Sequence, residues 1–65
     1  MNQLKKEFYA GMLCALAVVA ADGEESIYRA IVNTGGGPRP FLDVAEDYDR
    51  IHLLRYYTPE GEERI

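Results

Sequence analysis

This chain of 65 residues contains one cysteine, one histidine and no tryptophan. A lone cysteine, Cys14, cannot close a disulfide within the chain, and with one histidine it supplies too few ligands for a zinc site. Small domains usually need a disulfide, a metal or oligomerisation to supplement a limited core. We therefore expect no metal and no cofactor, and we expect oligomerisation or a partner protein to complete this fold.

Basic residues are also few: seven lysines and arginines stand against eleven aspartates and glutamates, giving a formal net charge of −4. Nucleic-acid backbones and anionic membrane surfaces attract proteins of the opposite sign. The charge balance therefore argues against direct binding of nucleic acid or membrane. Other proteins are the expected partners.

A recognisable catalytic arrangement is absent as well. His52 is the only histidine, Ser26 is the only serine, and nothing in their spacing brings them together with a carboxylate such as Asp49. General acid–base catalysis needs a base within about 2.6–3.2 Å of its target and a pocket that excludes water. The sequence therefore predicts a protein that binds rather than an enzyme.

What the chain does have is an unbroken apolar run from Phe8 to Ala21. A helix that is apolar all round has to be covered on every side. At about 1.5 Å per residue the run spans roughly 21 Å, short of the roughly 30 Å of a bilayer core. Two lysines before the run and small residues at its end also resemble a signal peptide, so a secreted peptide remains an alternative. Glu7 and Tyr9 favour a buried helix.

Two stripes divide the surface of this predicted helix. The bulky stripe consists of Phe8, Met12, Leu16 and Val19. The small-residue stripe consists of Ala10, Cys14, Ala17 and Ala21. Small side chains let another helix approach closely, so the second stripe predicts either self-association or packing within the chain. Inside an apolar run, we expect Cys14 to behave as a small buried hydrophobe.

Cap and turn residues predict the helical boundaries. Asn2 can cap a first helix that ends near Ala21, and a second helix over residues 24–34 completes a hairpin over residues 2–34. Gly35 is the expected left-handed cap of the second helix. The fold class is therefore mainly α, as a single small and oligomeric domain over residues 1–65.

The second half of the chain is harder to assign. Residues 35–40 are predicted to form a glycine–proline joint, followed by a third element over residues 41–58. From Ile51 the apolar residues fit the two-residue alternation of a strand as well as they fit the periodicity of a helix. This element is therefore either a third helix or a short C-terminal hairpin. Residues 59–65 are expected to be a mobile tail.

The joint itself could bind a ligand. Three glycines can expose backbone amides to an anion, and an arginine can pair with a phosphate through two hydrogen bonds. The residues concerned are Gly35, Gly36, Gly37 and Arg39. The preceding strand and the lysine of a P-loop are missing. A flexible joint is therefore the first interpretation, and a nucleotide or small-ligand site at a protomer interface is the alternative.

Acidic residues gather after the joint, at Asp43, Glu46, Asp47 and Asp49. On one continuous helix, the first three would share a face with Arg50. Such a row is either a solvated face or an acidic surface that docks against a basic groove of a partner.

Tyr56 and Tyr57, next to Arg55, form the predicted contact patch for a partner protein. Tyrosine and arginine are enriched in the hot spots of interfaces because each buries a large area and keeps a polar tip. The same rings could instead close the core of the bundle.

The segment over residues 6–32, KEFYAGMLCALAVVAADGEESIYRAIV, resembles the opening of short accessory proteins encoded by phages and prophages. The resemblance implies a small non-enzymatic protein that acts by binding in the cytoplasm of a bacterial host. Phage proteins of this size often inhibit host machinery, so it also implies an inhibitor of a larger host protein. No functional residue carries over.

Overall fold

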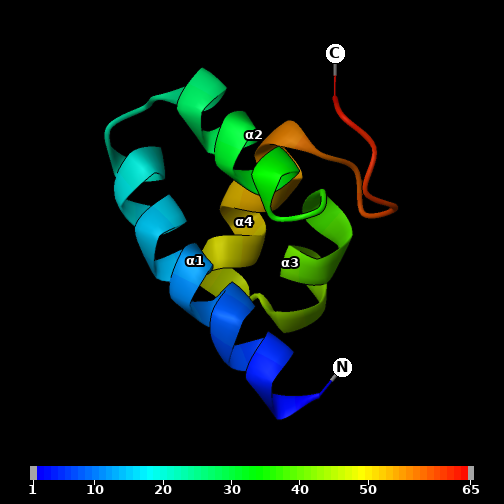
Figure 1. Ribbon diagram of the computed structural model, residues 1–65. Helices are drawn as coiled ribbons and strands as arrows, with labels where there is room; N and C mark the ends of the chain where they lie inside the picture. Colours follow the sequence, from blue (N-terminus) through cyan, green and yellow to red (C-terminus); the bar gives the residue numbers. More distant parts are fainter. Residues whose placement is uncertain (1, 65) are drawn as a thin grey trace.

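The computed structural model describes residues 2–64 and shows a bundle of four helices. They are α1 (Gln3–Ala21), α2 (Glu25–Thr34), α3 (Pro38–Val44) and α4 (Asp47–Tyr56). The longest helix, α1, runs along one side of the bundle with α2 beside it, while α3 and α4 pack against this pair (Figure 1). The mainly α fold predicted from the sequence is therefore confirmed.

The boundaries of α1 follow from its end residues. The Asn2 side chain accepts a hydrogen bond from the backbone N–H of Lys5 at 2.9 Å, which satisfies one of the free amides of the first turn. After Ala21 the chain turns through Gly23, whose φ of +73° lies in the left-handed region. The predicted first helix and its capping residue are thus confirmed.

Gly35 does not adopt the left-handed conformation that the sequence predicts, because its φ is −82°. The positive φ angles belong to the next two residues, Gly36 and Gly37. Gly35 is needed for a different reason: a Cβ atom there would lie 2.6 Å from the ring of Phe41. The end of α2 is therefore built on a close approach between Gly35 and Phe41.

The predicted third element over residues 41–58, a third helix or a short hairpin, is two short helices in the structure. The chain is extended at Ala45, with φ −66° and ψ 135°, and α4 begins only after Glu46. Arg50 stabilises this corner because its Nη1 donates to the carbonyl oxygen of Leu42 at 2.9 Å. The carboxylates of Asp47 and Asp49 in the first turn of α4 also suit the positive end of the helix dipole.

The segment after α4 folds back on the bundle. Tyr57 and Glu63 form an isolated antiparallel bridge, and the N–H of Thr58 donates to the carbonyl of Glu62 at 2.7 Å. The N–H of Arg64 donates to the carbonyl of Tyr56 at 2.9 Å. These contacts correct the prediction of a mobile tail as far as residue 64, and they combine the two alternatives: a helix and then a tight turn.

Every helix contributes to the hydrophobic core. Its buried members are Leu13, Leu16, Tyr28, Val32, Phe41, Leu42, Leu53, Tyr56 and Tyr57. Aromatic rings make up four of these nine residues, and a ring buries more apolar area than an aliphatic side chain does. This choice helps a short chain to fill its core.

Candidate protein-binding surfaces

The two faces of α1 differ in their surroundings. The inner face, defined by Tyr9, Leu13, Leu16 and Ala20, packs against the core. The outer face, defined by Leu4, Phe8, Gly11, Ala15 and Val18, is exposed. Leu4, Phe8 and Val18 retain 78 %, 57 % and 65 % of their accessible surface. The described chain therefore covers only one side of its most apolar helix.

The predicted bulky stripe of α1 is rotated relative to the observed core. Of its four residues, Leu16 is buried, Met12 and Val19 are half-buried, and Phe8 is exposed. Leu13, which belongs to neither predicted stripe, is buried instead. The inward direction is set by where the other three helices dock, and a run that is apolar at every position carries no signal for it.

The small-residue stripe lies beside the outer face. Ala10, Cys14 and Ala21 are exposed, whereas Ala17 is half-buried at the edge of the core. The expectation of a buried Cys14 is therefore wrong: its thiol lies on the surface. Three of the four residues predicted for self-association remain accessible to a second helix.

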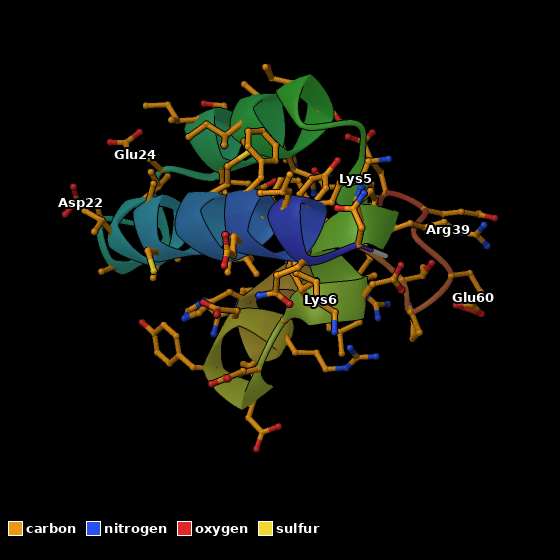
Figure 2. All side chains as sticks on the ribbon, turned by 60° about the horizontal axis from the view of Figure 1, so that its bottom comes forward. Lys5, Lys6, Asp22, Glu24, Arg39 and Glu60 are labelled. Atoms are coloured by element: carbon orange, nitrogen blue, oxygen red, sulfur yellow. The ribbon has the colours of Figure 1, made fainter. Side chains whose placement is uncertain are left out.

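The charges of α1 are segregated to its two ends. Lys5 and Lys6 lie at the amino-terminal end, and Asp22 and Glu24 follow the carboxy-terminal end (Figure 2). Glu7 is the only charged residue between Lys6 and Asp22. The outer face of α1 is thus an apolar surface with a positive end and a negative end.

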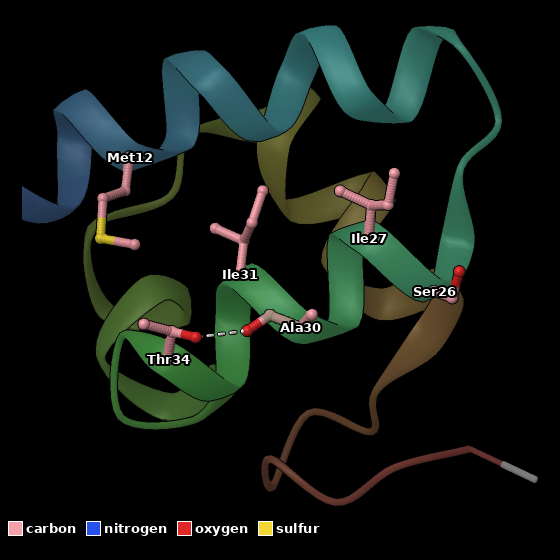
Figure 3. Close-up of a pocket in the computed structure, with 6 residues that line it drawn as sticks. All are labelled: Met12, Ser26, Ile27, Ala30, Ile31 and Thr34. Atoms are coloured by element: carbon pink, nitrogen blue, oxygen red, sulfur yellow. Dashed lines mark hydrogen bonds between the residues drawn. The ribbon is translucent and has the colours of Figure 1, made fainter.

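A shallow apolar groove of about 450 Å³ lies between α1 and α2. Its lining consists of Met12, Ser26, Ile27, Ala30, Ile31 and Thr34 (Figure 3). The Thr34 hydroxyl donates to the carbonyl of Ala30 at 2.8 Å, so it is already engaged. With no charged residue in this lining, the groove fits an apolar side chain better than a charged ligand.

The glycine-rich loop offers little to an anion. The N–H groups of Gly36 and Gly37 donate to the carbonyls of Asn33 and Val32 at 3.2 and 3.0 Å. The Nε of Arg39 donates to the carbonyl of Glu60 at 3.0 Å. The amides of Gly36 and Gly37 therefore close α2, and one N–H of the Arg39 guanidinium holds the C-terminal turn.

The acidic row does not lie on one helix face as the sequence predicts, because the chain bends between Asp43 in α3 and Asp47 in α4. Asp43, Glu46 and Asp47 are exposed, and Asp49 is half-buried. Burial raises the pKa of Asp49, and the nearby Glu46 carboxylate adds to the rise, while His52 opposes it. Three carboxylates thus remain available to a partner.

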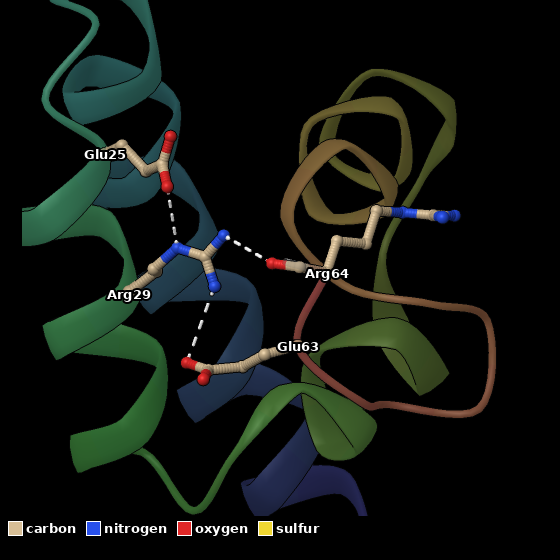
Figure 4. A network of polar contacts seen from close by, with 4 residues as sticks. All are labelled: Glu25, Arg29, Glu63 and Arg64. Carbon is tan, nitrogen blue, oxygen red and sulfur yellow. Dashed lines mark hydrogen bonds and ion pairs between the residues drawn. The ribbon is translucent and has the colours of Figure 1, made fainter.

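Tyr56 and Tyr57 are core residues, which corrects their prediction as contact anchors: 8 % and 0 % of their surfaces are exposed. Arg29 lies 5.5 Å from the centroid of each ring. Its guanidinium pairs with Glu25 at 2.9 Å and Glu63 at 3.4 Å (Figure 4). It also donates to the carbonyl of Arg64 at 3.3 Å. These rings and Arg29 attach the C-terminal segment to α2.

The exposed aromatic residue of this region is Tyr48, which sequence reasoning did not select. Tyr48 and Ile51 retain 56 % and 62 % of their surfaces, and Arg55 on the same face of α4 is exposed too. Their spacing of three and four residues places them on one face of a helix. This shared face can be recognised only once the start of α4 at Asp47 is known.

Two buried tyrosines have perturbed hydroxyls. Burial raises the pKa of Tyr28, and Asp49 and the two neighbouring tyrosines add smaller contributions. Burial also raises the pKa of Tyr57, against the opposing charge of Arg29. Among the described residues, no hydrogen-bond partner lies within reach of the Tyr57 hydroxyl or of Nδ1 of His52. These groups lie in or beside the packed interior.

The structure places the single serine and the single histidine in different surroundings. Ser26 lines the groove beside α1, whereas His52 packs against the Tyr48 ring with centroids 4.7 Å apart. Within residues 2–64, no group of three or more histidine, cysteine or acidic side chains could hold a metal ion. No helix in that part of the chain is both long and apolar enough to span a membrane.

No family model, no curated protein and no solved structure matches this chain.

Proposed function

We propose that this protein is a non-enzymatic binding module that self-associates through the outer face of α1 and contacts a larger protein through α4. The observation that carries the proposal is the exposure of Leu4, Phe8 and Val18 on one face of one helix. Exposed apolar residues that form one contiguous surface commonly mark a protein-binding site.

Self-association fits the size of the chain. A domain of about 60 residues buries a smaller fraction of its surface than a larger domain does, so covering an apolar face adds substantially to its stability. The exposed members of the small-residue stripe extend the outer face sideways. A second helix can therefore pack along α1 and approach it most closely beside these small residues.

The larger partner is assigned to the outer side of α4. Tyr48, Ile51 and Arg55 supply an aromatic ring, an aliphatic side chain and a guanidinium, and tyrosine and arginine are enriched in interface hot spots. The carboxylates of Glu46 and Asp47 lie beside them in the sequence. Because exposed charges mainly steer encounter, these carboxylates would accelerate association with a basic surface.

The biological setting is proposed from the resemblance of residues 6–32 to phage and prophage accessory proteins. The chain would then act in the cytoplasm of a bacterial host, where it inhibits a larger host protein by occupying a basic surface.

Capture from a bacterial lysate tests the proposal with three immobilised chains: wild type, Tyr48→Ser with Ile51→Ser, and the matched outer-face variant Phe8→Ser with Val18→Ser. We expect one identified protein to bind the wild type and to be lost with the α4 variant. For the purified complex, Asp47→Asn should slow association. Tyr48→Ala should speed dissociation and so weaken the affinity by about 2 kcal/mol. Capture that survives the α4 changes in a folded chain would refute the assignment to α4.

A further inference from the structure

We propose that two copies of this chain pair through the outer faces of α1 in an antiparallel, two-fold symmetric arrangement. The inference rests on the proposed self-association and adds the orientation and the register of the contact. Three features of α1 carry it: the spacing of the outer face, the charges at the two ends, and the position of Cys14.

The outer face has the spacing of a helix–helix seam. Leu4, Phe8, Gly11, Ala15 and Val18 follow one another at intervals of four, three, four and three residues. This alternation is the pattern that brings two helices together along a shared stripe. A helix of 19 residues is about 28 Å long, so the seam occupies most of α1.

The end charges select the orientation. In an antiparallel pair, Lys5 of one copy approaches Asp22 of the partner subunit, and two-fold symmetry repeats the contact at the other end. In a parallel pair, lysines meet lysines and carboxylates meet carboxylates, which costs free energy. Between the two ends, Glu7 is the only charged residue of α1. The middle of the helix therefore does not favour the parallel pair.

The spacing of the seam fixes the register. Its positions interlock when the numbers of facing residues add up to about 26, and Lys5 then lies close to the partner subunit's Asp22, because these two numbers add up to 27. Phe8 then faces the partner subunit's Val18, and Gly11 faces the partner subunit's Ala15. The contact has bulky layers toward its ends and small residues at its centre, where the two backbones can come close.

Cys14 lies beside this centre. It is exposed and directly precedes Ala15 of the seam. In an antiparallel pair, the residue that precedes Ala15 lies on the same side of the seam in both copies. The two Cys14 side chains therefore approach each other near the two-fold axis. In a parallel pair, they lie on opposite sides of the seam.

The size of the contact indicates its strength. One helix pair of this length buries an area at the low end of specific interfaces. We therefore expect a reversible dimer with a dissociation constant in the micromolar range.

Oxidation of the native thiol tests the orientation. Diamide, which takes two electrons and two protons from a pair of thiols, should link wild-type chains through Cys14 at concentrations where the dimer forms. The matched control is Cys14→Ser with Ala10→Cys, which moves the thiol one turn along the same flank. Because the two moved thiols lie about 9 Å apart along the axis, we expect the control to link at least about tenfold more slowly. Equal rates would overturn the antiparallel register.

Charge reversal separates this inference from self-association itself. Asp22→Lys with Glu24→Lys brings the net charge from −4 to zero, and so does the matched control, Glu60→Lys with Glu62→Lys. Lower net charge alone favours association in both variants. The antiparallel pair predicts that only the first weakens the dimer, about tenfold, and that adding Lys5→Glu and Lys6→Glu restores it. Sedimentation equilibrium measures the constants, and circular dichroism verifies the fold. A dimer that tightens equally in both variants refutes the orientation and leaves self-association standing, whereas a wild type that stays monomeric refutes both.

Discussion

The inner and outer faces of α1 are built from similar residues but meet different surroundings. Leu13 and Leu16 on the inner face are 2 % and 1 % exposed, whereas Phe8 and Val18 on the outer face keep more than half of their surface. Hydrophobicity of a helix position therefore does not reveal whether it packs within the chain or against another chain. The difference lies in which face the other helices reach.

Core truncation should show the largest difference between the two faces. Leu16→Ala should lower the free energy of unfolding by about 2–5 kcal/mol, because it removes buried methyl groups and leaves a cavity. Val18→Ala, the matched change on the outer face, should alter the stability of the single chain by less than about 0.5 kcal/mol. Urea denaturation at low micromolar concentration measures both. Equal losses would mean that the two faces are equivalent in the folded chain.

Alkaline pH should also distinguish the faces, because the core contains Tyr28 and Tyr57 while the outer face has no tyrosine. Burial raises the pKa of both hydroxyls in the folded chain. Their contribution to stability is complete below the unfolded pKa of about 10 and is lost as the pH rises from there through the folded pKa. Each group should cost up to about 1.4 kcal/mol per pH unit in that window.

Thermal unfolding between pH 8 and pH 11.5 measures this loss. Tyr28→Phe should reduce it, and Tyr48→Phe, which changes an exposed ring, should not. A stability that is flat up to pH 11.5 would contradict the assignment of both hydroxyls to the interior.

Gly11→Ala sharpens the comparison through two effects of opposite sign. A Cβ at Gly11 meets no atom within 4 Å apart from its chain neighbours and the nearby backbone of its own helix, and alanine is favoured over glycine in a helix by about 0.5–1 kcal/mol. The single chain should therefore become more stable. If a second helix approaches closely at this position, the same methyl group should weaken the dimer severalfold. Melting at low concentration and sedimentation at high concentration separate the effects, and an unchanged dimer would place Gly11 outside the contact.

Arg39→Ala should have the smallest effect. Arg39 makes one exposed hydrogen bond to a backbone carbonyl and lies beside Gly61 in the C-terminal turn. Its loss should cost less than about 0.5 kcal/mol, with no change in either face of α1. Thermal-shift screening against nucleotides provides the check. A ligand-dependent rise in melting temperature that Arg39→Ala abolishes would restore the alternative of a phosphate site.

Local signals predicted the helices well. The Asn2 cap and the Gly23 turn act within a few residues, so α1 and the start of α2 are readable from the sequence. The corner at Ala45 is different, because it depends on a hydrogen bond from Arg50 to Leu42 that forms only in the folded chain. Missing this corner placed the acidic residues on one continuous helix.

Predicting the surfaces failed for a related reason. Tyr48, Tyr56 and Tyr57 are chemically equivalent in the sequence, and only the packing of α4 decides that the first is exposed and the other two are buried. In α1, apolar residues occupy every face of the run, so no periodicity marks the inner one. The sequence predicts that α1 carries an apolar surface with small residues, whereas the fold decides which face of α1 is exposed.

The most direct test of the central claim is sedimentation equilibrium of the wild type and of Phe8→Ser with Val18→Ser, from about 1 to 500 µM, a range that brackets the affinities of small interfaces. We expect a reversible dimer for the wild type, and a monomer with unchanged helical content for the outer-face variant. Tyr48→Ser with Ile51→Ser, which alters an equally exposed apolar pair on α4, should dimerise as the wild type does. A wild type that remains monomeric throughout, or an outer-face variant that dimerises normally, would contradict the account.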